Sequence, residues 1–506
     1  MNGQPLPTRH PFGTSAALQF ALIVLFALAA RWNALGDPNY QIDETFYLVV
    51  GKAMHQGAMP YLDIWDRKPP GLFAIYWLAA SFANPVLAYQ LLALLSVILT
   101  AWLLRGIGAT LAGQQAGLLT GLAYAAMLQP LLGGGGQSPV FYNLLIAAAA
   151  ALFARATSEV DRARLRRSAL LAAFAGGLAV AIKPTALFEG AFICLAFAWQ
   201  ARRMGMESAK LARLLLAMAL AGAAPMLTAF AWYALEGQFS AIWQATVMSI
   251  FARKAEDLPN QVHILRYTLT ELAPLLLLAA LGAWLGGKPP LARFVRGWTL
   301  AAVAGFVAVP GFYLHYALPL AAPLAVLAAP AFALRLAGPL AALGLVSLAL
   351  LHGGSFDLAR KGGSVRSMSE ASAAVRANLG HGPLYVYSGP PLLYLSSGSH
   401  RPTRFLFPEH LSIRDEMAAT GVDTRLEVSA ILARQPRVIV LRARPFRAPN
   451  PLTCPLVRAA LARNYHLVRK VAMTEYAGRY DLLIFALSVA EPSQPNAALQ
   501  WVCVSL

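Results

Sequence analysis

Acidic and basic residues enclose one polar stretch near the N-terminus, residues 41–71, and their types could support a group transfer. Asp43 and Glu44 open the stretch, and Arg67 and Lys68 close it. A carboxylate can take a proton from a nucleophile, and cations can stabilise an anionic leaving group. The residues therefore indicate a reaction in which a base removes a proton while a negatively charged group departs.

A third cation of interest lies at Lys183, between two apolar segments that read as a hairpin of short helices. A lysine at membrane depth is costly unless it faces water or an anion. Counting crossings places this hairpin tip on the same membrane face as Asp43 and Lys68. Structural roles stay open for each residue, because acids favour the first turn of a helix and lysines often lie at the membrane interface.

The composition shows what kind of scaffold must position these residues. Of 506 residues, 58% are hydrophobic and 13% charged, and the mean hydropathy is +0.55. An ordinary soluble enzyme is less apolar, so we predict a polytopic α-helical membrane protein. The net charge of +18 does not indicate nucleic acid, because many of the basic residues lie in short loops and no aromatic-interleaved basic platform is present.

Apolar runs predict about 11 transmembrane helices. The run 71–104 is interrupted at Asn84-Pro85 and reads as a half-helix followed by a full span that ends at Arg105. The basic loop 155–167 anchors the topology, because short loops rich in Lys and Arg stay cytoplasmic. The N-terminus is then cytoplasmic, and the predicted spans are residues 15–35, 71–104, 108–132, 140–153, 168–182, 185–199, 211–235, 265–285, 298–312, 318–334 and 340–351.

This topology divides the chain into two domains. Residues 1–351 form the transmembrane domain, with periplasmic loops at 36–70 and 236–263, and residues 352–506 form a periplasmic α/β domain. Short strands are expected at 383–389, 437–442 and 480–487, with helices at 369–378 and 424–434. In the first loop, residues 45–56 have one apolar face and predict a helix that lies on the membrane surface.

Three cysteines are too few for a disulfide framework. Cys194 falls in an apolar run and reads as a small core residue. Cys454 and Cys503 would share an oxidising compartment, and the sequence leaves a bridge between them open. The first apolar run has no clear cleavage site, which favours an uncleaved helix over a signal peptide.

The order of these motifs resembles the membrane-embedded GT-C glycosyltransferases that use polyprenyl-phosphate sugars. This group includes the bacterial aminoarabinose transferases and the protein O-mannosyltransferases. The resemblance covers residues 15–351, and the C-terminal domain is similar to the periplasmic domains of bacterial members. The matching pieces are Asp43-Glu44-x-x-Tyr47, Pro60-Tyr61, Lys68-Pro69-Pro70, Lys183-Pro184 and His315-Tyr316.

The resemblance implies an inverting transfer at the periplasmic face of the bacterial inner membrane. The donor would be a sugar on undecaprenyl phosphate, and the acceptor a hydroxyl of a cell-envelope glycan, a lipid or a protein. Asp43 would be the general base, with Glu44 assisting it. The implied donor-phosphate ligands are Arg67, Lys68 and Lys183, and the implied substrate-pocket residues, for which anchoring at the interface is the alternative, are Tyr47, Tyr61, His315 and Tyr316.

Three departures from the aminoarabinose transferases leave the sugar open. Phe46 and Arg67 replace an arginine and a glutamate of those enzymes, and Asn143 stands in place of an aspartate. The departures argue against carrying over a zinc site, and no cofactor is predicted, although a divalent metal stays open. Glu256, Asp257 and His263 lack tight ligand spacing and are interpreted as a solvated loop. The alternatives from other classes are a polytopic transporter and a non-catalytic envelope-assembly protein.

Overall fold

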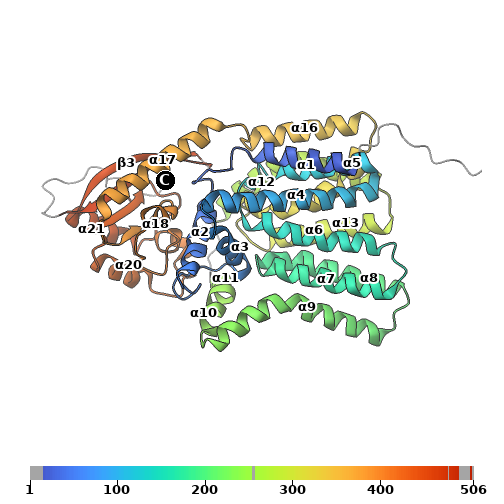
Figure 1. Cartoon of the computed structure of the whole chain (residues 1–506), viewed down its shortest axis with the longest axis horizontal. Coiled ribbons are helices and arrows are strands. Elements are labelled where there is room, and N and C mark those ends of the chain that lie inside the picture. Colours follow the sequence, from blue (N-terminus) through green and yellow to red (C-terminus); the bar gives the residue numbers. More distant parts are fainter. Residues whose placement is uncertain (1–14, 253–256, 477, 489–501, 504–506) are drawn as a thin grey trace, which may run out of the picture.

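The protein consists of a long helical bundle with a smaller α/β domain at one end (Figure 1). The computed structural model describes residues 15–252, 257–476, 478–488 and 502–503. The predicted cytoplasmic tail, residues 1–14, lies outside this range. Asp43, Lys68 and Lys183 all lie at the end of the bundle that meets the α/β domain. The helices and the α/β domain together form this junction.

The bundle consists of apolar helices that run along the long axis of the molecule (Figure 1). Their bounds are α1 (Ala16–Arg31), α3 (Pro70–Ala80), α4 (Pro85–Ala112), α5 (Gln114–Met127), α6 (Ser138–Ala156), α7 (Arg162–Val180), α8 (Leu187–Arg203), α9 (Ser208–Leu235), α12 (Leu258–Leu285), α13 (Pro290–Val307), α14 (Leu318–Leu327), α15 (Ala329–Phe332) and α16 (Ala337–His352).

Local signals explain where several of these helices begin and end. The predicted interruption at Asn84-Pro85 is present: the side chain of Asn84 caps α4 and Pro85 occupies its first turn. The predicted end of this span at Arg105 was wrong, because α4 continues for two more turns to Ala112. It ends at Gly113, whose φ of 92° is a left-handed conformation that favours glycine.

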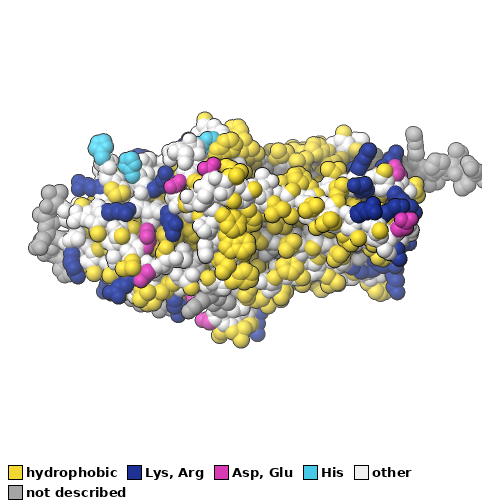
Figure 2. Space-filling view, turned by 90° about the horizontal axis from the view of Figure 1, so that it is seen from below, with side chains coloured by type: hydrophobic (Ala, Val, Ile, Leu, Met, Phe, Trp, Pro, Cys, Tyr) yellow, Lys and Arg dark blue, Asp and Glu magenta, His cyan; other side chains and the backbone are white. Residues whose placement is uncertain are grey.

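The bundle is built for a membrane. Four described helices, α4, α6, α9 and α12, are each long and apolar enough to cross a bilayer, and shorter apolar helices accompany them. The surface of the bundle is broadly hydrophobic, and Lys and Arg side chains gather at the end far from the α/β domain (Figure 2). The count of about 11 spans stays a prediction.

The predicted loop 236–263 is largely helical. Residues 239–252 form α10 (Phe239–Trp243), a π-helical turn (Gln244–Met248) and α11 (Ser249–Ala252), and α12 begins at Leu258. The sequence predicted a loop over these residues, and the structure makes them helical. Aromatic packing accounts for the difference, since Phe239 stacks on Trp243 and both rings contact Phe230 of α9.

The C-terminal domain contains a four-stranded mixed sheet in the order β1-β2-β4-β3. β1 pairs with β2 in parallel, and β4 lies antiparallel between β2 and β3. The three predicted strands are present, whereas β3 was missed because exposed charges interrupt its apolar residues. The elements are α17 (Leu358–Leu379), β1 (Leu384–Val386), α18 (Leu392–Ser397), α19 (Glu409–Ser412), α20 (Thr424–Ala433), β2 (Val438–Arg442), α21 (Cys454–Asn464), β3 (Tyr465–Glu475) and β4 (Gly478–Leu487).

A disulfide joins Cys454, at the start of α21, to Cys503 near the C-terminus. The sequence had left this bridge open. It ties the end of the chain back to the α/β domain.

Helix α2 (Ile42–His55) is packed between the bundle and the α/β domain. Phe46, Tyr47 and Val50 are each about 1% exposed, and the ring of Phe46 lies 5.1 Å from that of Phe407. The prediction that this helix lies on the membrane surface was therefore wrong, because the C-terminal domain covers the face left free by the bundle. The first turn of α2 carries Asp43 into the junction.

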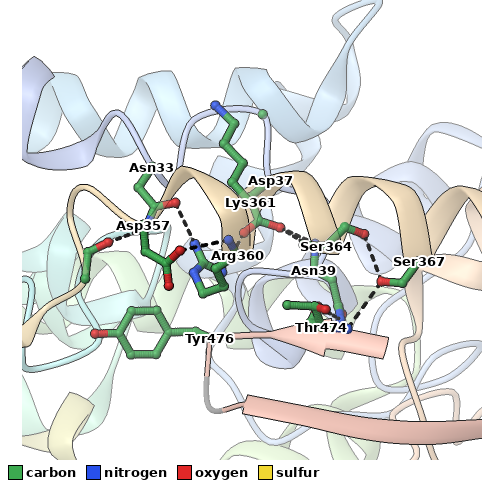
Figure 3. A network of polar contacts seen from close by, with 12 residues as sticks. Asn33, Asp37, Asn39, Asp357, Arg360, Lys361, Ser364, Ser367, Thr474 and Tyr476 are labelled. Carbon is green, nitrogen blue, oxygen red and sulfur yellow. Dashed lines mark hydrogen bonds and ion pairs between the residues drawn. The ribbon is translucent and has the colours of Figure 1, made fainter. Parts of the chain in front are cut away.

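A polar network fixes the two domains together beside this junction (Figure 3). Arg360 of α17 binds Asp37 at 2.8 Å and Asn33 at 3.0 Å, both in the segment that follows α1. Asn39 donates a hydrogen bond to the carbonyl of Thr474 at the end of β3. Asp37 is fully buried and its ion pair with Arg360 is nearly so, which makes the contact a strong orienting constraint.

Candidate active site

A cavity of about 390 Å³ lies where the end of the bundle, α2 and the C-terminal domain meet. This volume falls in the range of small-ligand sites. Its charged and polar lining comes from segments that are far apart in the sequence. The ionisable lining residues are Asp43, Asp66, Arg67, Lys68, His263, His315, Glu409, His410, Glu416, Arg442, Arg447 and Glu475, accompanied by Tyr40, Tyr47, Tyr267, Tyr313, Tyr316 and Tyr476.

Asp43 faces this cavity from the first turn of α2. Its Oδ2 accepts a hydrogen bond of 3.2 Å from Nε2 of Gln137, which begins the approach to α6. Burial alone would raise the pKa of the Asp43 carboxyl, but the neighbouring positive charge, that of Lys68 first, and the bond from Gln137 outweigh it, so the pKa is lowered. The carboxylate is therefore ionised at neutral pH and held in one orientation.

Lys68 reaches the cavity from the loop before α3. The hydroxyl of Tyr61 donates a 2.8 Å hydrogen bond to the Lys68 carbonyl, and Pro70 starts α3 directly afterwards. Tyr61 is 1% exposed and is not among the residues that line the cavity, so its position favours holding this loop over touching a substrate. Across the described part of the chain, no carboxylate forms an ion pair with the Lys68 ammonium.

Lys183 lies at the turn between α7 and α8, before the short 3-10 helix Pro184–Ala186. Its Nζ is 4.5 Å from the ring centroid of Tyr316, and Tyr316 also lines the main cavity. Burial, together with repulsion from Lys68, lowers the pKa of Lys183 to about 7 despite attraction from Asp43. The attraction from Asp43 thus does not balance the burial of the ammonium, and an incoming anion would stabilise its charged form.

His315 and Tyr316 line the cavity together with Asp43. The His315 ring stacks on Tyr313 at 5.9 Å and meets Tyr316 edge-on at 4.6 Å. Burial and the neighbouring Lys183 lower the pKa of His315 to about 3, so its imidazole is neutral at pH 7 and the lysines carry the positive charge of the site. Tyr47 lines the cavity one turn after Asp43 on α2, with its ring packed against Phe73 and Tyr76.

Arg67 also lines the cavity, but its guanidinium is already matched by a carboxylate. It forms a two-pronged ion pair with Glu416 of the C-terminal domain, and the two side chains are 14% and 4% exposed. A guanidinium engaged in this way has less charge to offer a phosphate than a free ammonium. The geometry thus distinguishes Arg67 from Lys68 and Lys183, with which the sequence had grouped it.

Glu44 is fully buried and points away from the cavity, under the glycine turn of residues 133–136. Burial raises its pKa to about 8, so the carboxyl is protonated at neutral pH. Arg31 of α1 binds the same turn, with Nη2 donating to the carbonyl of Gly135 at 2.6 Å. Glu44 is therefore placed to support the turn that leads to Gln137, and through it Asp43.

We expect Gly135→Ala to disturb this support. The added Cβ would overlap the Glu44 carboxyl, and relieving the overlap must move either the turn or the start of α2. Overpacking of this kind costs about 1–3 kcal/mol. Thermal unfolding of the purified protein should show the loss. Gly106→Ala in α4, where nothing lies within 4 Å of the new Cβ, is the control, and equal unfolding temperatures for the two variants would contradict the prediction.

The sequence did not indicate the contribution of the C-terminal domain to the cavity. Glu409 and Glu416 lie in or beside α19, Arg442 ends β2, and Arg447 follows it. Their only local signal is charge next to an apolar strand, which also describes an ordinary solvated surface. The contact between Gln137 and Asp43 joins residues 94 positions apart and has no local signal in the sequence.

Metal ligation was left open by the sequence. Among the described residues, no group of three or more His, Cys, Asp or Glu side chains is placed to hold an ion. Of the three loop residues considered, Glu256 lies outside the described range, Asp257 caps α12 through the N–H of Asn260, and His263 lines the cavity.

Comparison with known proteins places the fold. No family model matches the sequence, and no curated protein matches it. The structure is similar to that of ArnT from Cupriavidus metallidurans bound to undecaprenyl phosphate, with a TM-score of 0.62 and 14% identity over 93% of this chain and 98% of that one. The apo state of the same enzyme gives a TM-score of 0.61.

A more distant similarity is to the oligosaccharyltransferase of Archaeoglobus fulgidus in its apo form. The TM-score is 0.50, with 11% identity over 96% of this chain and 77% of that one. ArnT is an aminoarabinose transferase, and both proteins have the GT-C architecture. The chain therefore has the fold of the GT-C membrane glycosyltransferases, as the order of its motifs predicted.

Proposed function

We propose that the protein is an inverting glycosyltransferase that moves a sugar from undecaprenyl phosphate to an acceptor hydroxyl of a cell-envelope glycan, lipid or protein. One observation carries the proposal: Asp43 and Lys68 line a single cavity at the end of an apolar bundle, and the Lys183 ammonium lies beside Tyr316 of the same lining, where its charge acts on Asp43. The similar fold of ArnT, whose crystal contains undecaprenyl phosphate, supports the choice of donor.

The charges suit each step of such a transfer. Asp43 accepts the proton of the acceptor hydroxyl while that oxygen attacks the anomeric carbon of the donor sugar. The bond between the anomeric carbon and the phosphate oxygen breaks, and its electron pair leaves with undecaprenyl phosphate. Lys68 and Lys183 stabilise the charge that develops on this leaving group. Attack and departure on opposite faces of the sugar invert its configuration.

The proposed location is the periplasmic face of the bacterial inner membrane. The loops that join α6 to α7 and α8 to α9 lie at the end far from the C-terminal domain (Figure 1), and the helix ends beside them carry exposed arginines, including Arg166 of α7 and Arg203 of α8. Basic loops stay cytoplasmic, which favours a periplasmic cavity and C-terminal domain. The disulfide between Cys454 and Cys503 supports the same assignment, because the periplasm is oxidising.

The decisive experiment supplies the purified full-length protein, in lipid nanodiscs, with a panel of undecaprenyl-phosphate sugars and an acceptor extract from the cell envelope. We expect one donor to be consumed, with release of undecaprenyl phosphate and an inverted linkage in the product. Transport of a substrate without any donor being consumed would contradict the proposal.

The pH dependence of the reaction should report Lys183. Because its pKa is about 7 in the free protein, the ammonium that attracts the donor phosphate is lost as the pH rises through neutrality. We expect kcat/KM for the donor to fall above about pH 7, whereas kcat should fall at a higher pH because bound phosphate stabilises the ammonium. In Lys183→Arg, the fall in kcat/KM should move to a higher pH, because arginine keeps its proton. If the fall stays at the same pH, Lys183 is not its source.

A further inference from the structure

The C-terminal domain contributes charged residues of both signs to the lining of the cavity. We call this part of the lining the C-terminal wall and define it by five residues: Glu409, Glu416, Arg442, Arg447 and Glu475. None of them belongs to the motifs that carry the proposed donor chemistry. The wall therefore has a chemistry of its own that the transfer of the sugar does not explain.

Every guanidinium of this wall is matched by a carboxylate. Arg442 binds both oxygens of Glu475 at 3.0 and 3.2 Å, and the side chains are 11% and 16% exposed. Arg447 lies 3.9 Å from Glu409 and donates a hydrogen bond to the Tyr313 hydroxyl. Each pair is largely buried.

The third pair joins the wall to the loop before α3, where both terminal nitrogens of Arg67 donate hydrogen bonds to the Glu416 carboxylate. Including Asp43 and Asp66, five carboxylates and four Lys or Arg side chains line the cavity. This balance contrasts with the net charge of +18 of the whole chain. Among the described residues, Lys68 and Lys183 have no carboxylate within ion-pair distance, which distinguishes them from the arginines of the wall.

We infer that the C-terminal wall is the acceptor subsite and that it selects an uncharged sugar, presented as a glycan hydroxyl, over an acceptor that carries phosphate. The inference rests on the proposed function and names the acceptor class for the same cavity. It follows from the pairing of charge: the lysines are available to an anion, whereas each guanidinium of the wall already has a carboxylate partner.

The physical reason is that a guanidinium and a carboxylate that are already paired can still form hydrogen bonds with a neutral ligand. A sugar hydroxyl both donates and accepts hydrogen bonds, so it can accept from a guanidinium N–H and donate to the neighbouring carboxylate without disturbing the pair. A phosphate only accepts at neutral pH and would have to displace Glu409 or Glu475 from its arginine, while meeting their negative charge. The wall therefore rejects anions and binds hydroxyl groups.

The binding test uses pairs of probes that differ only in charge. Methyl glycosides of glucose, galactose, mannose and N-acetylglucosamine, and their 6-phosphates, are compared by saturation-transfer difference NMR with the full-length protein in nanodiscs. We expect a neutral glycoside to bind at least about tenfold more tightly than its phosphate, equivalent to about 1.4 kcal/mol. Equal or tighter binding of the phosphates, or binding of neither probe, would overturn the inference.

Variants of one ion pair give opposite expected signs. Glu409→Gln removes the counter-charge of Arg447 and should reduce the preference for the neutral probe about tenfold, whereas Arg447→Gln should increase it. Glu370→Gln is the matched control, because it breaks the exposed pair with Arg469 in the same domain, outside the cavity lining. If Glu409→Gln behaves like Glu370→Gln, the wall does not set the selectivity and the inference is wrong.

A turnover assay distinguishes a failure of the acceptor assignment from a failure of the proposed function. With the donor found in the panel assay, acceptor-dependent release of undecaprenyl phosphate should be faster with the neutral glycosides. Faster release with phosphorylated glycosides, or release only with peptide acceptors, would overturn the acceptor assignment while leaving the glycosyltransferase intact. Failure of every donor, with neutral probes still bound selectively at the wall, would instead contradict the proposed function alone.

Discussion

Asp43→Asn is expected to lower the rate of sugar transfer by about 10²–10⁴-fold, the usual contribution of a general base. Asparagine keeps the shape of the side chain and can still accept the hydrogen bond from Gln137, so the fold should persist. It cannot take the acceptor proton. Transfer is measured with the purified protein, the identified donor and saturating acceptor.

Two further measurements make this prediction specific. Binding of undecaprenyl phosphate, followed by native mass spectrometry, should be retained or tightened in Asp43→Asn, because a negative charge near the phosphate is removed. Asp63→Asn, in the same loop but outside the cavity lining, should remain active. Near-normal transfer by Asp43→Asn would remove the proposed base.

Lys68→Met is expected to lower kcat by about 10²–10³-fold, the range seen when one group that stabilises transition-state charge is removed. Methionine retains the length and much of the apolar stem of lysine, so the loop held by Tyr61 should keep its conformation. Adding Lys183→Met should also weaken the binding of undecaprenyl phosphate itself. The two effects need not be additive, because both lysines act on one phosphate.

The control for the lysine variants is Lys52→Met, which removes an exposed ammonium from α2 outside the cavity lining. Its rate and lipid binding should match the natural sequence. If the variants at Lys68 and Lys183 bind undecaprenyl phosphate as tightly as Lys52→Met does, the donor phosphate is held elsewhere. Such a result would leave Asp43 without its proposed leaving-group partners.

Much of the fold could be predicted from the sequence because the relevant signals are local. Runs of apolar residues long enough for a bilayer indicated the helices, and Asn84 with Pro85 marked the start of α4. Strands β1, β2 and β4 appeared as short apolar runs. The sequence missed β3 because its charged exposed face masks the alternation.

Placing Asp43, Lys68 and Lys183 at one end of the bundle required only a count of crossings. Segments on the same side of a membrane must emerge at the same end of their helices, and basic loops label the other end. The sequence could thus predict which residues share an end of the bundle. It could not predict which of them point at one another.

By itself, the sequence determined the class of protein, the order of its elements and the candidate residues for transfer from a lipid phosphate. Only the tertiary structure decided that Glu44 supports a glycine turn and that Arg67 is neutralised by Glu416, 349 residues away. The reason is physical: hydropathy and capping are encoded within a few residues. A buried ion pair, in contrast, depends on how two domains dock. In the sequence, each of its charged residues is equally consistent with a position on an exposed surface.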